Sequence, residues 1–359
     1  MNLNLLKGIL VLLVVVDHNE FSRSLFPGFL EGFSFHVVGF LVVPFLRPVV
    51  PWSRDYLNYL FRLYYPFLLI VTLMAIVVAW LTPVTAQEQA WLWLHALYSG
   101  NSAILKQVTD MALLWFLPSF ISLVTLRTAI DNSSRAGKAT AIALLCLAHL
   151  FVGAVARDIE HYLPLGLLPA VYVVPLAYLG VLLHRQVYER MTVPAALLVS
   201  TIIFVAAKYA QMRAGLHAEV GFAVVADYRT PLALLLNDLE AVTGVLMLFQ
   251  VARVRLGGWL GLCGKYSLQV YLFHAFVALL VYKGLLRVGA GWPVAALFTV
   301  SMLVTVVLTV PLARFLAEQP LVRRLLFPRS PADLLGRAPD SDGRAAAISS
   351  TATHSDARQ

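Results

Sequence analysis

Long runs of apolar residues, separated by short polar stretches, repeat along most of the 359-residue chain. A helix needs about 20 apolar residues to cross the hydrocarbon core of a bilayer, and these runs have about that length. No run alternates polar and apolar residues as the strands of a membrane barrel would. Because backbone groups in lipid must be paired within each segment, the pattern predicts an all-α, polytopic bundle of transmembrane helices. We expect about ten helices, at residues 5–21, 28–46, 63–81, 111–130, 139–154, 165–183, 193–210, 231–250, 266–286 and 293–316.

The composition and the charge pattern support a membrane protein and place the ends of the chain. Hydrophobic residues make up 60% of the sequence and charged residues only 13%, which excludes an ordinary soluble protein. Most of the 27 Lys and Arg residues fall on the side that holds both termini, so we expect both termini in the cytoplasm. The net charge of +8 then reflects this topology and an anionic inner leaflet, and we expect no nucleic-acid partner.

The apolar character ends shortly before the C-terminus. The sequence therefore predicts a transmembrane domain at 1–327 and a disordered cytoplasmic tail, rich in Pro, Ser, Asp, Gly, Ala and Arg, at 328–359. Two outer connections, 82–110 and 211–230, are long and partly apolar, and short interfacial or re-entrant helices are expected there. A cleaved signal peptide is the alternative for the first apolar run, but polar and acidic residues stand where its small-residue cleavage site would be.

An ionisable pair, Asp17-His18, ends the first apolar run. Charged groups in hydrocarbon are costly, so they indicate a functional site unless they only pair within the bundle. Lys7 lies 11 residues before His18, on nearly the same helix face and about 16 Å away along the axis. Lys7 could meet a phosphate at the inner mouth, or it could be a topogenic charge that snorkels. His36, in the second run, can reach the depth of His18, so both histidines could face one cavity.

Two further polar residues stand out in later runs. His274 lies near the middle of 266–286, where its alternative role is a structural hydrogen bond to a neighbouring helix. Arg62 precedes 63–81 at the inner interface, where a single arginine is often only topological. The nine His and two Cys residues match no metal-ligand or redox spacing, so we expect no metal and no tightly bound cofactor.

Six short motifs, taken in their order along the chain, resemble those of the acyltransferase-3 family of integral membrane acyltransferases, which modify sugars, polysaccharides and related acceptors. The motifs, which extend from residue 5 to residue 320, are Lys7-Gly8 with an apolar run to Asp17-His18, Phe33-Ser34-Phe35-His36, Arg62-Leu63 before Pro66, Leu114-Trp115-Phe116-Leu117, Gly264-Lys265-Tyr266-Ser267 ahead of Tyr271-Leu272-Phe273-His274, and Glu318-Gln319-Pro320. The chain departs from the family at Val38 and Pro44-Phe45, where many relatives have a proline and then Ser-Gly, and at Tyr59, where relatives often carry a second arginine.

The resemblance implies a multi-pass enzyme of the bacterial plasma (inner) membrane. Such an enzyme takes an acyl group, acetyl by default, from cytoplasmic acyl-CoA as co-substrate and transfers it to a hydroxyl of a sugar or cell-envelope glycan. His18, oriented by Asp17, would be the general base or a transient acyl carrier, and His36 and His274 would stabilise the oxyanion or position the acceptor. The residues expected to bind acyl-CoA or substrate are Lys7, Arg62, Trp115, Tyr271, His274 and Glu318.

The same residues leave two rival functions open. Asp17, His18 and His36 could form the proton relay of a non-enzymatic transporter or exporter of a glycan or small molecule. The departures from the family pattern would fit a sensor or scaffold with a degenerate site. The sequence also leaves open the acceptor, a succinyl or other acyl group in place of acetyl, and a homo-oligomer.

Overall fold

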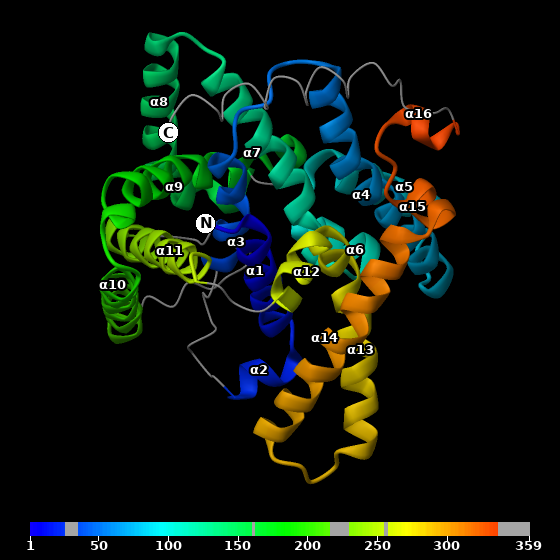
Figure 1. Cartoon of the computed structure of the whole chain (residues 1–359). Coiled ribbons are helices and arrows are strands. Elements are labelled where there is room, and N and C mark those ends of the chain that lie inside the picture. Colours follow the sequence, from blue (N-terminus) through cyan, green and yellow to red (C-terminus); the bar gives the residue numbers. More distant parts are fainter. Residues whose placement is uncertain (26–34, 160–161, 216–229, 255–257, 337–359) are drawn as a thin grey trace, which may run out of the picture.

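The chain folds as a bundle of α-helices (Figure 1). The computed structural model describes residues 1–25, 35–159, 162–215, 230–254 and 258–336, and within these ranges it contains no β-strand. The α-helices are α1 (Leu3–Asp17), α2 (Glu20–Leu25), α3 (Phe35–Val42), α4 (Arg54–Leu81), α5 (Ala86–Ser99), α6 (Ser102–Thr109), α7 (Phe116–Asp131), α8 (Arg135–Ile159), α9 (Leu167–Gln186), α10 (Val193–Arg213), α11 (Pro231–Val251), α12 (Gly258–Lys265), α13 (Ser267–Val288), α14 (Val294–Glu318), α15 (Pro320–Leu326) and α16 (Pro331–Leu334). Short 3-10 helices join them at η1 (Val43–Leu46), η2 (Ala112–Trp115), η4 (Pro164–Gly166) and η5 (Tyr188–Arg190).

The predicted membrane bundle is confirmed. Eight stretches of the described residues are long and apolar enough to cross a membrane, and they coincide with the last eight predicted segments. The first predicted segment, 5–21, is divided instead: α1 ends at Asp17, and the separate helix α2 follows. Of the second predicted segment, 28–46, residues 28–34 lie outside the described residues, and the remainder forms α3 and η1.

The connecting segments are more helical than simple loops. Helices α5 and α6 occupy the predicted 82–110 connection and pack against α4. In the 211–230 connection α10 continues to Arg213, and residues 216–229 lie outside the described part. The tail predicted from residue 328 begins with the helical turn α16, whose Leu334 carbonyl accepts hydrogen bonds from the Arg324 guanidinium. Residues 337–359 of the tail lie outside the described part.

Helix α1 lies at the centre of the bundle, where it contacts α3, α11, α12, α13 and α14 (Figure 1). Two glycines allow α12 to approach it at backbone distance. A Cβ atom on Gly8 would collide with the Leu260 carbonyl oxygen, and a Cβ atom on Gly264 would collide with the Asn4 carbonyl oxygen. Only glycine fits at such a close approach of two backbones. The glycine contact therefore fixes α1, and with it every side chain that α1 presents.

Candidate functional site

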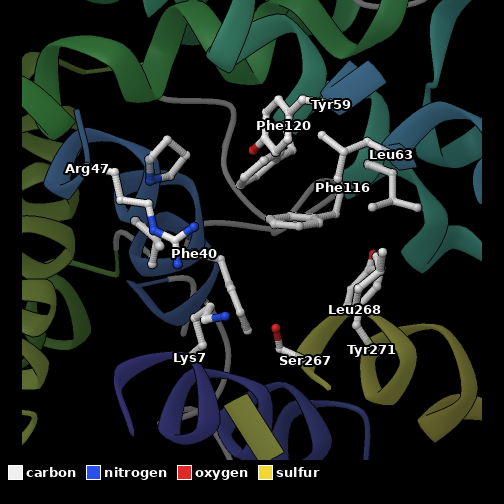
Figure 2. Close-up of a pocket in the computed structure, with 13 residues that line it drawn as sticks. Lys7, Phe40, Arg47, Tyr59, Leu63, Phe116, Phe120, Ser267, Leu268 and Tyr271 are labelled. Atoms are coloured by element: carbon white, nitrogen blue, oxygen red, sulfur yellow. The ribbon is translucent and has the colours of Figure 1, made fainter. Parts of the chain in front are cut away.

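A cavity of about 220 Å³ lies between α1, α3 with η1, α4, α7 and α13. Its walls are mainly aromatic and aliphatic, and both charged residues in its lining are cations, Lys7 and Arg47. Figure 2 shows the nitrogen atoms of these two side chains on one side of the cavity. The remaining lining residues are Phe40, Val43, Pro44, Tyr59, Leu63, Phe116, Leu117, Phe120, Ser267, Leu268 and Tyr271. A cavity of this kind suits a ligand with an anionic end and an apolar arm.

The chain positions the two cations differently. Lys7 lies in the second turn of α1 and is half-buried. Arg47 directly follows η1, where Pro44 helps to end the apolar helix α3 and the backbone becomes extended. On the opposite wall Tyr271 is held by two neighbours: its hydroxyl donates to the Leu113 carbonyl, and its ring lies 5.2 Å from that of Phe116, centroid to centroid.

His18 caps the C-terminal end of α1, and its surroundings fix its tautomer. The ring Nδ1 lies 2.8 Å from the carbonyl oxygen of Val14. Because a carbonyl oxygen can only accept, Nδ1 carries the proton and Nε2 presents a lone pair. Nε2 has no hydrogen-bond partner among the described residues, and the side chain is 35% exposed. The negative end of the α1 dipole lies at this end of the helix.

Asp17 lies between two imidazoles. Its Oδ2 atom is 3.9 Å from Nδ1 of His18 and 3.8 Å from Nε2 of His36, which is fully buried in α3. Both separations exceed hydrogen-bond length, so the carboxylate acts on the two rings through charge. The sequence predicts that Asp17 orients His18. In the structure the Val14 carbonyl makes the hydrogen bond that orients the ring. His18 and His36 thus lie near one carboxylate, but neither lines the cavity that contains Lys7 and Arg47, and the shared cavity expected for them stays a prediction.

His274 connects the cavity wall to His18. Its Nδ1 lies 2.6 Å from the carbonyl oxygen of Tyr271, which lines the cavity. Its ring packs edge-on against His18 with centroids 5.3 Å apart. Nε2 of His274 is buried and has no hydrogen-bond partner among the described residues. We call Asp17, His18, His36 and His274 the His18 group; it lies beyond Tyr271, toward the C-terminal end of α1.

Besides His274, three residues predicted to bind substrate lie outside the cavity lining. Arg62 is exposed and donates from Nε to the Arg329 carbonyl at 2.9 Å. Trp115 is buried in η2, next to the lining residue Phe116. Glu318, at the end of α14, accepts from the Tyr266 hydroxyl at 2.5 Å. The binding roles of these three residues stay predictions.

Arg47 is the cavity cation that sequence reasoning missed. An arginine at the end of an apolar run is expected from membrane topology alone, so its place in the run does not indicate a binding role. The signal that could have identified it is its position between Pro44 and Pro48, which restrict the backbone around it. Tyr59, at the position where relatives often have a second arginine, lines the same cavity.

A second buried polar cluster, the Asp238 group, consists of His149, Tyr172, Asn237 and Asp238 on α8, α9 and α11. The carboxylate of Asp238 lies 2.9 Å from Nε2 of His149 and accepts from the Tyr172 hydroxyl at 2.8 Å. The Asn237 amide donates to the same hydroxyl at 2.6 Å, and Nδ1 of His149 lies 2.8 Å from the Tyr172 carbonyl oxygen. None of these four residues lines the cavity that contains Lys7 and Arg47.

The fold and the site together define a polytopic membrane protein. Near one end of α1 its cavity can hold an anionic group, and at the other end of α1 a histidine can accept a proton. The acyltransferase-3 family model, which describes an acyltransferase domain, matches residues 2–314. The chain therefore belongs to the acyltransferase-3 family and is a membrane acyltransferase. Comparison with curated proteins and with solved structures gives no match.

Proposed function

We propose that this acyltransferase transfers an acyl group, acetyl by default, from acyl-CoA to a hydroxyl of a sugar or cell-envelope glycan. Lys7 and Arg47 bind phosphates of the donor at the cytoplasmic mouth of the cavity. The thioester arm extends toward His18 over the roughly 16 Å that separates Lys7 from His18 along α1. The single observation that supports this proposal most strongly is that one helix carries both a cation of the cavity and a histidine with an accessible lone pair.

His18 acts as the general base. Nε2 takes the proton of the acceptor hydroxyl while the hydroxyl oxygen attacks the thioester carbonyl. When the tetrahedral intermediate collapses, the C–S bond breaks, and the thiolate of coenzyme A receives the proton from His18. The products are an ester and free coenzyme A, so His18 returns to its starting state. The Val14 carbonyl keeps the correct tautomer throughout, because it holds Nδ1 as a donor.

The neighbouring groups assist through charge and position. The carboxylate of Asp17 and the C-terminal end of α1 both stabilise the imidazolium that forms transiently on His18. Because Nδ1 of neutral His274 donates to Tyr271, Nε2 of His274 is an acceptor and can hold the acceptor hydroxyl, but it cannot donate to an oxyanion. His36 is the second ring near the Asp17 carboxylate, so the negative charge of Asp17 acts on His36 as well as on His18.

Acyl transfer in a reconstituted membrane tests this function. The purified protein in phospholipid vesicles is supplied with radiolabelled acetyl-CoA or succinyl-CoA and with cell-envelope glycans, and the glycans are analysed by mass spectrometry. We expect labelled acyl groups on glycan hydroxyls only when the protein and one acyl-CoA are both present.

The exporter alternative gives the opposite result in the same vesicles. In that case glycan would cross the membrane without acyl-CoA, and no acyl mass shift would appear. Mass spectrometry of envelope glycans from cells with and without the gene adds the identity of the acceptor. Unchanged glycans in both samples would contradict the proposed reaction.

A further inference from the structure

We infer that Arg127 is a positioning residue that holds the charged rim of the cavity in place for the donor phosphates. The inference rests on the proposed function, since it assigns Arg47 to donor binding. Arg127 lies on α7 and is buried, with only 8% of its surface exposed. It does not line the cavity itself. Any effect of Arg127 on the donor must therefore pass through the residues that it contacts.

The guanidinium of Arg127 binds the backbone within η1 and directly after it. Nη1 donates to the carbonyl of Pro44, and Nη2 donates to the carbonyl of Arg47 at 2.6 Å. Both acceptors belong to residues of the cavity lining. One side chain thus fixes the first turn of η1 and the residue that follows it, and so determines where the Arg47 side chain begins.

The Pro44 carbonyl also accepts a hydrogen bond from the backbone N–H of Arg47 within η1, whereas the Arg47 carbonyl lies past the end of the helix and accepts from Arg127. A helix leaves carbonyl groups unpaired at its C-terminal end, and η1 has only four residues. A guanidinium presents several N–H donors in a rigid, planar fork, so it can bind two carbonyls at once. A lysine ammonium is a point charge on a flexible stem and cannot reproduce that geometry. Arg127 is therefore specific for the task, although its own side chain is not part of the cavity lining.

The charge of Arg127 is itself compensated. Its Nε donates to Oδ2 of Asp131 at 3.2 Å, and the other carboxylate oxygen accepts from the Tyr178 hydroxyl at 3.0 Å and from Lys138. Phe45 of η1 completes the cluster: its ring centroid lies 5.1 Å from Cζ of Arg127 and 5.0 Å from the ring centroid of Tyr178. The cluster joins α7 and α9 to η1, and loss of one member of its buried ion pair would leave the other charge uncompensated.

The prediction is a selective loss of donor affinity. In Arg127→Lys we expect the KM for acyl-CoA to rise about tenfold, while kcat changes little. A tenfold rise corresponds to the loss of about one charge-assisted hydrogen bond. The same loss should appear as weaker binding of coenzyme A in a calorimetric titration. Arg190→Lys, on the exposed turn η5, is the matched control and should bind coenzyme A like the wild type.

A double-mutant cycle separates positioning from general stability. If Arg127 acts through Arg47, Arg127→Lys should change the KM little further once Arg47→Ala has removed the guanidinium that binds the phosphate. Equal effects of Arg127→Lys in both backgrounds would overturn the inference and indicate a purely structural role. Should Arg127→Lys fail to fold, Tyr178→Phe loosens the same cluster by one hydroxyl and should give a smaller rise that also depends on Arg47.

The titration also distinguishes the proposed donor from the positioning role of Arg127. Wild-type protein that binds no coenzyme A would contradict the proposed donor, and the positioning role would fall with it. Wild-type protein that binds coenzyme A, together with an Arg127→Lys variant of equal affinity, would overturn only the positioning role.

Discussion

The His18 group and the Asp238 group contain the same kinds of residues but differ in how far their polar atoms are paired. Both place histidine next to aspartate inside the bundle. In the Asp238 group the carboxylate and both ring nitrogens of His149 have partners at 2.8–2.9 Å. In the His18 group Asp17 is near 4 Å from both rings, and Nε2 of His18 and of His274 have no hydrogen-bond partner among the described residues.

We interpret this difference as one between a structural network and the group that we propose for the chemistry. A buried polar network whose members are all paired rigidifies the helices that it joins. A ring nitrogen left with a lone pair in the bundle is costly, and it is retained where a proton or a substrate must bind. Exposure points the same way, because the side chain of His18 is 35% exposed and that of His149 only 7%.

The largest expected effect is the loss of acyl transfer in His18→Ala. A general base contributes about 10²–10⁴-fold, so the rate should fall by at least that lower bound while the protein remains folded in the membrane. Initial rates with labelled acyl-CoA and the thermal unfolding midpoint give both quantities. His18→Asn is the sharper variant, because its amide can still donate to the Val14 carbonyl but cannot act as a base at neutral pH. Full activity in His18→Asn would show that the residue is needed only for its hydrogen bond.

The second effect concerns the position of the His18 group. Gly8→Ala places a methyl group against the Leu260 carbonyl oxygen and should displace α1 from α12, at a cost of about 1–3 kcal/mol in stability. Because α1 carries both Lys7 and His18, we expect acyl transfer per folded molecule to fall as well. Gly261→Ala, on the same helix α12, adds a methyl group with no heavy atom within 4 Å and is the control. Similar losses in both variants would contradict this view of the glycine contact.

The third effect is smaller, and we expect it in the stability of the protein and not in its activity. His149→Phe keeps an aromatic ring stacked on Tyr172 but removes the hydrogen bond to Asp238. We expect the free energy of unfolding to fall by about 1–2 kcal/mol, a typical value for a polar contact between membrane helices. Acyl transfer per folded molecule should stay unchanged. A loss of activity without a loss of stability would instead connect the Asp238 group to the reaction.

The bundle was predictable from the sequence because it depends on a strong signal, the length of each apolar run. The division of the first run was not, since the residues around His18 and Asn19 remain compatible with a longer helix until the capping bonds are known. Depth along two helices suggested that His18 and His36 could face one cavity; the structure places both near Asp17, and neither in the cavity that contains Lys7 and Arg47. The Asp238 group was missed, because its members lie on three helices and no sequence spacing connects them.

The same limit explains the binding residues. Lys7 and Tyr271 were predicted and line the cavity, whereas Arg62 was predicted but contacts the backbone of Arg329. Which face of an interfacial helix an arginine occupies depends on tertiary packing. The positions that sequence patterns alone could not assign are therefore those where a side chain acts across helices, as Arg127 does on η1.

The smallest expected effect tests whether the chemistry needs a thiol as well as the His18 group. Cys263 lies on α12, the short helix that packs on α1, and burial raises the pKa of its thiol to about 11. Near neutral pH the group is therefore protonated and a poor nucleophile, and its thiolate would form only as the pH approaches that value. We expect Cys263→Ala to keep the wild-type rate and the wild-type pH profile of acyl transfer. Cys146→Ser, at an exposed position on α8, serves as the control. An acyl group trapped on Cys263, or a rate that rises with pH only when Cys263 is present, would replace direct transfer at His18 by a covalent route.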